Sequence, residues 1–241
     1  MEKKRPDELE NLNISSHEPL EQAERTACPK CNRKRKYLCY DCELGLVEDI
    51  PQVELPVKVQ ILKCKKEPRS KSSAVPGAVL SPNVEVIDCL PSSVPEFSPG
   101  TVLVYPGESA TPIWEMSKEA LSSIRSAVFI DSTWRQTFAM LNSGSLDKLP
   151  MVKLVSHRTL FWRYQDKGKE SLATIEAVYH FLVDYHNAMH QQGLFEPYQG
   201  TYDDLLWLYT FNYQLIQKEY TERRHKGKRF RHMPDYIKRP N

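Results

Sequence analysis

The sequence predicts an α/β protein with a parallel sheet at its centre. Five short apolar segments have the length of buried strands, and connections of about 10–25 residues separate them. Parallel strands need such crossover connections, whereas antiparallel hairpins are joined by a few residues. Strands are expected at residues 57–62, 84–88, 101–105, 127–130 and 151–155.

Helices are expected between and after these strands. Residues 134–141 are predicted to form a short helix that ends at an Asn-Ser-Gly sequence. Apolar residues at helical spacing predict a longer helix over about 172–190. A further helix over about 203–218 opens on two aspartates, which suit the positive end of its dipole. The segments 92–100 and 106–112 are rich in Pro, Gly and Ser and are predicted to be loops.

Composition agrees with a globular protein. A chain of 241 residues holds one substantial α/β domain plus a small appendage, and 40% hydrophobic residues suffice for a packed core. The first residues contain no apolar signal region, and no segment approaches the roughly 18 consecutive apolar residues of a membrane-spanning helix. We therefore expect a soluble intracellular protein with no membrane association.

Charge is spread unevenly along the chain, although its net value is only +2. Residues 1–24 carry three basic and seven acidic groups, residues 25–42 carry six and one, and residues 218–241 carry nine and three. Clustered Lys and Arg suit a polyanion such as RNA, whose phosphates dominate affinity. A solvated face or a nuclear-import signal is the alternative reading of either cluster.

Changes in charge and composition along the sequence divide the chain into four parts. Residues 1–25, rich in Glu, Asn and Ser, are expected to form a flexible leader. A cysteine-rich module over 26–48 precedes the α/β domain over 49–219, and a basic tail, disordered until it binds, occupies 220–241. We expect the protein in the nucleus, with the cytoplasm as an additional location.

Two C-x2-C pairs, separated by seven residues, define the cysteine module. Each pair forms a tight turn that aims both sulfurs inward, so four thiolates at this spacing can bind one tetrahedral Zn²⁺. Closed four-cysteine ligation leaves no open coordination site, so the metal would be structural. Free or redox-active cysteines are the alternative. The predicted zinc ligands are Cys28, Cys31, Cys39 and Cys42.

Basic residues in two loops are candidates for contact with RNA phosphates. A folded metal site would present the loop between the cysteine pairs toward phosphate, and a second basic loop follows the first strand. Solvation alone is the alternative explanation for both loops. The candidates are Arg33, Lys34, Arg35, Lys36, Arg69 and Lys71.

Asp131 is the candidate for chemistry. It follows the strand at 127–130, at the carboxyl edge where ligands of open α/β sheets bind. Thr133 and Gln136 have the spacing of a capping box, which would start a helix directly after the acid. The helix dipole would favour an ionised carboxylate. The alternative is that Asp131 merely caps the helix or pairs with Arg135.

Several motifs resemble those of one family. Asp131-Ser132-Thr133-Trp134 matches the Asp-x-Thr-Trp signature of the DTW-domain family. An upstream C-x2-C pair, Tyr105-Pro106-Gly107 after a strand, SHRTLFWRYQ with Arg158 and Arg163, and the segment Leu172–Ala177 follow in the family's order. The resemblance covers about residues 26–218 and is greatest to the eukaryotic tRNA-uridine aminocarboxypropyltransferases of that family.

This resemblance implies a fold and a reaction. The fold is SPOUT-like, a parallel sheet with a trefoil knot in its C-terminal half, although knots are rare in general. The family transfers the 3-amino-3-carboxypropyl group of S-adenosylmethionine to N3 of a tRNA D-loop uridine, here expected at U20, and releases methylthioadenosine. The partner would therefore be tRNA. A SPOUT-type RNA methyltransferase and a non-catalytic zinc-bearing RNA-binding adaptor are the alternatives.

The resemblance also implies site residues. Asp131 would act as general base for the uridine N3 proton or hold the amino group of S-adenosylmethionine. Glu176, in the first turn of a helix, would pair with Arg158 or Arg163, and a plain structural ion pair is the alternative. Arg163 is also a candidate RNA contact. The residues expected at the co-substrate are Tyr105, Pro106, Gly107, Asp131, Thr133, Trp134, Arg158, Leu172, Thr174 and Glu176.

Overall fold

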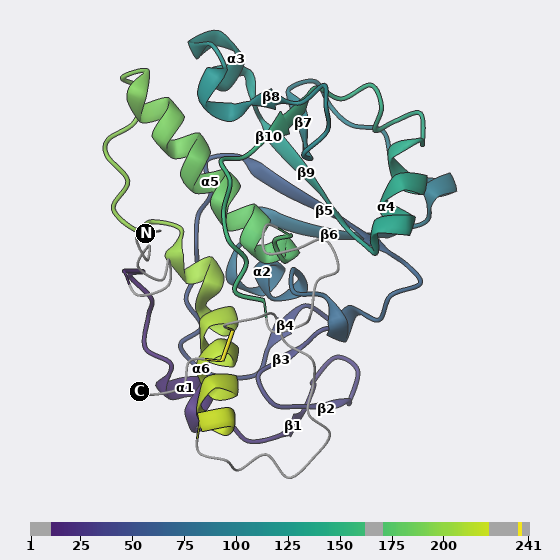
Figure 1. The fold of residues 1–241 in the computed structure, drawn as a ribbon. Helices are drawn as coiled ribbons and strands as arrows, with labels where there is room; N and C mark the ends of the chain where they lie inside the picture. The colour runs from purple at the N-terminus through teal and green to yellow at the C-terminus, as the bar shows by residue number, and fades with distance from the viewer. Residues whose placement is uncertain (1–10, 162–170, 222–235, 238–241) are drawn as a thin grey trace.

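A six-stranded parallel sheet forms the centre of the protein (Figure 1), whose computed structural model describes residues 11–161, 171–221 and 236–237. Within these residues, every pairing in this sheet is parallel. In spatial order the strands are β6 (Val84–Cys89), β5 (Lys58–Cys64), β9 (Ser126–Asp131), β7 (Thr101–Val104), β10 (Met151–Lys153) and β8 (Thr111–Pro112).

The five strands predicted from the sequence are confirmed, with small shifts at their ends. The sequence prediction omits β8, which lies in a segment predicted to be a loop. This strand is only two residues long and contains Pro112, which cannot donate a hydrogen bond to a neighbouring strand. Its position at the edge of the sheet, beside β10 alone, tolerates that loss.

Three predicted helices are also present: α4 (Trp134–Leu141), α5 (Thr174–Gln191) and α6 (Trp207–Thr221). The last one differs from the prediction at its start, because residues Asp203–Leu206 form a separate 3-10 turn, η4. The shorter elements between strands are α2 (Val75–Leu80), α3 (Lys118–Ser123), η1 (Arg69–Lys71), η2 (Pro91–Ser93) and η3 (Ile113–Glu115).

The two faces of the sheet bury different hydrophobic clusters, because side chains alternate along each strand. On β5, Val59 and Ile61 belong to the larger cluster, to which α5 and α6 contribute Phe181 and Phe211 among others. Leu62 belongs to the smaller cluster, together with Met140 of α4. Helices therefore cover both faces, as a fully parallel sheet requires.

The cysteine module consists of two small antiparallel ladders. β1 (Thr26–Ala27) pairs with β2 (Lys34–Arg35), and β3 (Leu38–Cys39) pairs with β4 (Leu44–Gly45). In Figure 1 the module lies below the sheet and beside α6. Tyr37 anchors it there, since its ring meets Phe211 of α6 edge-on with 5.5 Å between the ring centroids.

The leader that we predicted to be flexible packs against the domain from residue 11 onward. Leu20, in the short helix α1 (Glu18–Glu21), is completely buried. Ser15 donates hydrogen bonds from its backbone N–H and its hydroxyl to the carboxylate of Asp204, at 2.7 and 2.6 Å. The prediction is wrong for residues 11–25 because Leu12, Ile14 and Leu20 pack on the hydrophobic core and polar contacts with η4 and α6 hold the segment in place.

The basic tail is described only at residues 236–237. Tyr236 is buried there, its ring edge-on to Tyr213 of α6, and its carbonyl accepts a hydrogen bond from Gln217 Nε2 at 2.7 Å. The tail is therefore packed at this point, in contrast to the predicted disorder. The other residues beyond Thr221 lie outside the described part of the chain.

The predicted trefoil knot concerns the C-terminal half of the domain. Residues 162–170, between β10 and α5, lie outside the described residues, so the knot stays a prediction. The non-consecutive strand order agrees with an open α/β fold that crosses the sheet several times. None of the described helices is both long and apolar enough to cross a lipid bilayer.

Candidate functional site

A cavity of about 840 Å³ opens at the carboxyl edge of the sheet. Its walls are the segments that follow β5, β7, β9 and β10, together with the start of α5. Small-molecule sites commonly measure about 300–1,000 Å³, so the volume suits a nucleoside-sized ligand. Of the residues expected at the co-substrate, those that line the cavity are Tyr105, Pro106, Asp131, Thr133, Leu172 and Thr174.

Asp131 ends β9 and is held by hydroxyl groups from two other segments. Ser72 Oγ donates a hydrogen bond to Oδ2 at 2.5 Å, and Thr174 Oγ1 donates one to Oδ1 at 2.7 Å. Asp131 forms no ion pair within the described residues, so the alternative of pairing with Arg135 is not observed. A carboxylate has about four lone-pair sites. Asp131 therefore keeps acceptor capacity for a donor in the cavity.

The helix α4 starts directly after this acid, as the capping-box spacing predicts. Gln136 Oε1 accepts hydrogen bonds from the backbone N–H of Thr133 at 3.0 Å and from the Thr133 hydroxyl at 2.8 Å. The Ser132 hydroxyl bonds to that of Thr137 at 2.8 Å. These contacts fix the turn without Asp131, so the acid is not needed as a cap. The side chain of Trp134 lies outside the described part of the structure.

Tyr105-Pro106-Gly107 forms the turn that leaves β7. The Tyr105 N–H donates to the carbonyl of Val152 at 3.0 Å, and the Gly107 N–H donates to the Tyr105 carbonyl at 2.9 Å. Gly107 itself is not among the residues that line the cavity. A Cβ atom at this position would lie 3.2 Å from Met151 Sδ, so the glycine permits a close approach between two strand ends.

Glu176 is not among the residues that line the cavity, and it is only 3% exposed. Its carboxylate accepts hydrogen bonds from the Thr159 hydroxyl and from the backbone N–H groups of Leu160 and Ala173, each at 2.7 Å. Burial raises the pKa of Glu176, although these three donors oppose the rise. The residue thus joins the segment after β10 to the start of α5, two walls of the cavity.

The predicted ion pair of Glu176 is not observed with Arg158. Arg158 is exposed, and Glu176 has no cationic partner among the described residues. Two backbone N–H groups and a hydroxyl satisfy the buried acid instead. The sequence does not reveal the donors from Thr159 and Leu160, because these residues belong to another segment. Arg163, the second predicted partner and an expected RNA contact, lies outside the described residues.

The cavity also contains His157, whose role the sequence did not suggest beyond its place in the SHRTLFWRYQ segment. Its Nε2 lies 3.3 Å from Oδ2 of the buried Asp184 on α5, and that oxygen also accepts from the Val155 N–H at 3.0 Å. The ring stacks on His180, with centroids 3.7 Å apart. Desolvation, assisted by His157, lowers the pKa of His180 to about 3, so His180 is neutral at pH 7.

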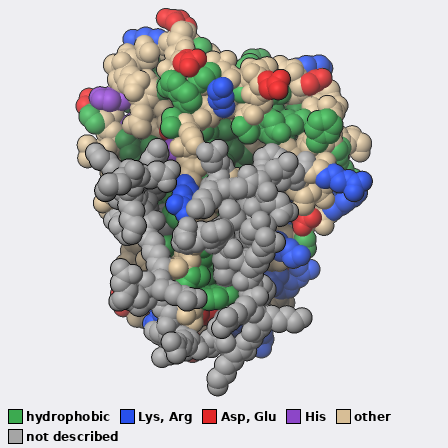
Figure 2. Space-filling model, viewed as in Figure 1, with side chains coloured by type: hydrophobic (Ala, Val, Ile, Leu, Met, Phe, Trp, Pro, Cys, Tyr) green, Lys and Arg blue, Asp and Glu red, His purple; other side chains and the backbone are tan. Residues whose placement is uncertain are grey.

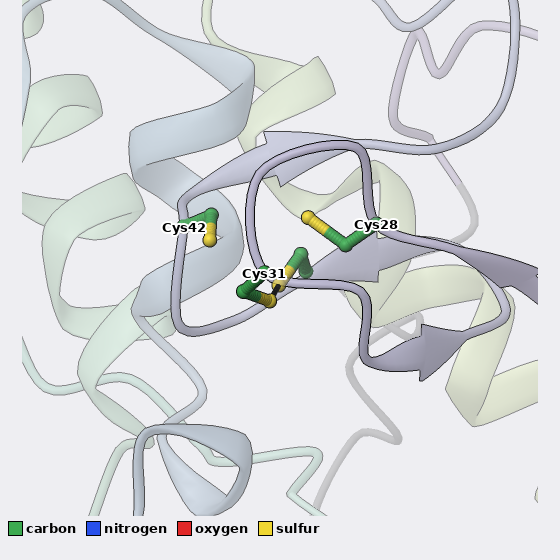
Figure 3. A group of neighbouring side chains, drawn as sticks. Cys28, Cys31 and Cys42 are labelled. Atoms are coloured by element: carbon green, nitrogen blue, oxygen red, sulfur yellow. Dashed lines mark hydrogen bonds between the residues drawn. The ribbon is translucent and has the colours of Figure 1, made fainter.

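The four predicted zinc ligands meet in one cluster (Figure 3). Their Sγ atoms all lie within 4.8 Å of one another, and those of Cys31 and Cys39 are 3.5 Å apart. Four sulfurs on Zn–S bonds of about 2.3 Å would be about 3.8 Å apart, so the cluster fits a four-coordinate zinc. Asn32 and Glu43, directly after the two pairs, have φ of 57° and 48°, so both pairs end in a left-handed residue. The described residues contain no other such ligand group.

The basic loop between the cysteine pairs is partly neutralised. Arg33 and Arg35 both contact Asp41 Oδ2, at 2.7 and 3.0 Å. The hydrogen bonds from Arg33 and then Arg35 lower the pKa of Asp41, which remains ionised. Lys34 and Lys36 form no ion pair within the described residues, so they carry most of the available positive charge of this loop.

In the second basic loop, after β5, Arg69 and Lys71 have different surroundings. Arg69, predicted to contact RNA, is instead paired with Glu43 and Asp88, and its side chain is 20% exposed. A guanidinium that two carboxylates already occupy is a poor phosphate contact, so this part of the prediction is not supported. Lys71, from the same loop, lines the cavity.

Comparison with known proteins relates this geometry to a family. The sequence model of the DTW domain matches residues 25–217, which include the cysteine module, the whole sheet and Asp131. The chain belongs to the DTW domain family. The family signature Asp131-Ser132-Thr133-Trp134 therefore marks the end of β9 and the first residue of α4.

Relatives of this DTW protein cover most of its length. A Mus musculus protein named tRNA-uridine aminocarboxypropyltransferase 1 is 35% identical over 262 residues, which span 88% of this chain and 84% of that protein. The Rattus norvegicus protein of that name is 33% identical over 280 residues, spanning 95% and 88%. The Xenopus tropicalis protein is 31% identical over 258 residues, 86% of each. No solved structure gives a significant match.

Proposed function

We propose that this protein is a tRNA-uridine aminocarboxypropyltransferase that uses S-adenosylmethionine as donor. The observation that carries the proposal is the position of Asp131, from the family signature, in the wall of a cavity of about 840 Å³ at the carboxyl edge of the sheet. Relatives that bear this activity in their names align with nearly the whole chain. Binding RNA alone would not require an acid that two hydroxyls hold inside a cavity.

The reaction needs orientation more than activation. S-adenosylmethionine supplies a carbon activated by its sulfonium, so transfer forms the bond from uridine N3 to that carbon and breaks the carbon–sulfur bond, whose electrons leave on sulfur. The protein must hold N3 in line at about 3–3.5 Å and accept its proton. It must also present the aminocarboxypropyl carbon and not the methyl. The shape of the cavity would make that choice.

Asp131 is suited to one of two tasks. Ser72 and Thr174 set the direction of its carboxylate, and its remaining lone pairs can accept a proton from uridine N3 or hydrogen bonds from the amino group of the donor. The first task makes Asp131 the general base, and the second makes it the anchor that orients the transferred group. A variant of Asp131 that loses turnover alone would indicate the general base. A variant that also loses affinity for S-adenosylmethionine would indicate the anchor.

The tRNA would meet the protein at the mouth of the cavity and along basic side chains. Figure 2 shows Lys and Arg side chains gathered on the right of the face seen in Figure 1. Lys71 in the cavity wall and Lys34 in the cysteine module are exposed and can contact phosphates. A zinc ion held by Cys28, Cys31, Cys39 and Cys42 would stabilise the module and supply no chemistry to the reaction.

The deciding experiment is nucleoside mass spectrometry of tRNA incubated with the protein and S-adenosylmethionine. The proposal predicts a 3-amino-3-carboxypropyl adduct on uridine, with methylthioadenosine as the second product. Mapping of nuclease fragments would place the adduct, which we expect at U20 of the D-loop. A tRNA with cytidine at that position is the matched control and should remain unmodified.

Two other outcomes would overturn the proposal. A methyl adduct with S-adenosylhomocysteine as product would identify a methyltransferase on the same fold. Binding of tRNA without any adduct, and without measurable affinity for S-adenosylmethionine in calorimetry, would identify a non-catalytic RNA-binding protein.

A further inference from the structure

Arg69 connects the cysteine module to the sheet through all three of its guanidinium nitrogens. Nε donates to the carbonyl of Tyr40 at 3.1 Å, and Nη2 pairs with Glu43 Oε1. Nη1 pairs with Asp88 Oδ2, at the end of β6, at 2.6 Å. Tyr40 lies between two zinc ligands and Glu43 directly follows one, so the contact depends on the fold of the second C-x2-C pair.

The buried Lys63 adds a second cation to the charged cluster of Arg69, Glu43 and Asp88. Its side chain is 1% exposed, and its Nζ lies 2.8 Å from Asp88 Oδ1. The same ammonium donates to the backbone carbonyls of Cys64 at 2.9 Å and Glu67 at 2.5 Å. Two cations and two carboxylates thus balance, which leaves the cluster with no net charge to attract a phosphate. Its effect is to hold the loop that leaves β5.

The same loop continues into the cavity wall. Arg69 starts the 3-10 turn η1, whose end is fixed by the hydrogen bond from the Ser72 N–H to the Arg69 carbonyl at 3.1 Å. Ser72 Oγ then donates to Asp131 Oδ2 and accepts hydrogen bonds from the N–H groups of Ala74 and Val75 at 3.1 and 3.3 Å. Only two residues, Ser70 and Lys71, separate the contact with the cysteine module from the contact with Asp131.

We infer that Arg69 is a positioning residue, through which the folded cysteine module holds Ser72 against Asp131 in the cavity. The expected consequence is tighter binding of S-adenosylmethionine, and this consequence rests on the proposed function. The module is therefore a support for the cavity wall as well as a surface for RNA. Loss of the contact would free residues 64–75 to move, and the carboxylate of Asp131 would lose one of its two donors.

The test compares Arg69→Ala with Lys66→Ala. Lys66 lies in the same loop and is exposed, so its replacement removes an equal charge without touching the cluster. Hydrogen–deuterium exchange of the Ala74 and Val75 amides should accelerate at least tenfold in Arg69→Ala and stay unchanged in Lys66→Ala. Calorimetry should show S-adenosylmethionine binding at least fivefold weaker in Arg69→Ala alone. Zinc content should remain at the wild-type level in both variants.

A second variant, Glu43→Gln, weakens the same contact from its acidic side, because it replaces the ion pair with a neutral hydrogen bond. A positioning role predicts the same direction of change in exchange and in donor affinity, although the variant removes a negative charge. If Arg69→Ala does not fold, the exchange rates and the S-adenosylmethionine affinity of Glu43→Gln alone test the inference.

Two results would overturn the inference. One is wild-type exchange at Ala74 and Val75 in both Arg69→Ala and Glu43→Gln. The other is unchanged donor affinity in Arg69→Ala together with a flatter salt dependence of tRNA binding, which would make Arg69 a phosphate contact. A wild-type protein that binds no S-adenosylmethionine would overturn the proposed function instead. The exchange of the Ala74 and Val75 amides would still test whether Arg69 positions Ser72.

Discussion

Thr174 Oγ1 donates a hydrogen bond of 2.7 Å to Asp131 Oδ1 and so ties the first residue of α5 to the end of β9. Ser72 makes the matching contact with Oδ2. Two segments that are distant in the sequence therefore set the direction of one carboxylate. On the proposed function, that direction determines how the acid meets uridine N3 or the amino group of the donor.

Removal of the Thr174 hydroxyl should lower turnover while leaving the fold intact. Thr174→Val keeps the shape of the side chain but leaves Asp131 Oδ1 without its donor, and a hydrogen bond to a charged group contributes about 1.5–3 kcal/mol. We expect turnover to fall roughly tenfold or more, measured as adduct formed per minute on saturating tRNA. Thr174→Ser keeps the hydroxyl and should remain near wild type. An equal loss in both variants would point to the methyl group instead.

Asp131→Asn tests the acid itself. The amide keeps the size of the side chain but cannot accept a proton, so a general base would cost about 10²-fold or more in turnover with little change in donor affinity. An anchor for the amino group would show a parallel loss of S-adenosylmethionine affinity in calorimetry. Near-normal turnover would remove Asp131 from the reaction.

Glu176 should matter for stability more than its position in a family motif suggests. Glu176→Ala leaves the part-buried N–H of Leu160 and the buried N–H of Ala173 without an acceptor, and an unsatisfied buried donor costs about 1–3 kcal/mol. We expect the free energy of unfolding in urea to drop by at least about 2 kcal/mol. Glu108→Ala, at an exposed acid, should leave it unchanged. Similar values for the two variants would contradict the role of Glu176 in joining the cavity walls.

Stability should decline in acid partly because of His180. Its pKa is about 3 in the folded protein and 6.5 ordinarily. Between these values the unfolded chain binds a proton at this site that the folded protein does not. The free energy of unfolding therefore falls as pH drops below about 6.5, by at most ~1.4 kcal/mol per unit from this group.

A comparison of variants isolates this contribution. His180→Phe removes the titrating group, so its unfolding free energy should depend less steeply on pH between 4 and 6.5 than that of the wild type. Glu176, whose raised pKa gives the opposite slope, is present in both proteins and cancels. His190→Gln, at an exposed histidine, should retain the wild-type slope. Parallel curves for all three proteins would show that His180 is not kept neutral by the fold.

The purified protein should contain about one equivalent of zinc. Metal analysis of a Cys28→Ser and Cys39→Ser double variant should show that the zinc is lost, because each pair then keeps a single thiolate. Thermal unfolding of the wild type in a strong chelator should shift to lower temperature, while the double variant should not respond. Absence of zinc from the wild type, or retention in the double variant, would contradict the site.

The sequence by itself determined the local features of this protein. Apolar runs with connecting segments predicted the five longer strands, and the capping-box spacing predicted the start of α4 at Trp134. The C-x2-C pairs predicted a sulfur cluster, which the structure contains. These features depend on neighbours a few residues away, because hydrogen bonding and alternation within one element repeat along the chain. The family motifs identified Asp131 in the same way, by residues close to it in sequence.

Only the tertiary structure decided which distant groups these residues meet. Asp131 is 59 residues from Ser72 and 43 from Thr174, so both partners depend on which segments the sheet brings to one edge. Glu176 binds backbone N–H groups and not Arg158, and Arg69 binds carboxylates and not an exposed surface. A charged side chain takes whichever partner the packing places nearest, because burial makes an unpaired charge costly. Hydrophobic periodicity and composition do not indicate which partner a charged side chain will contact.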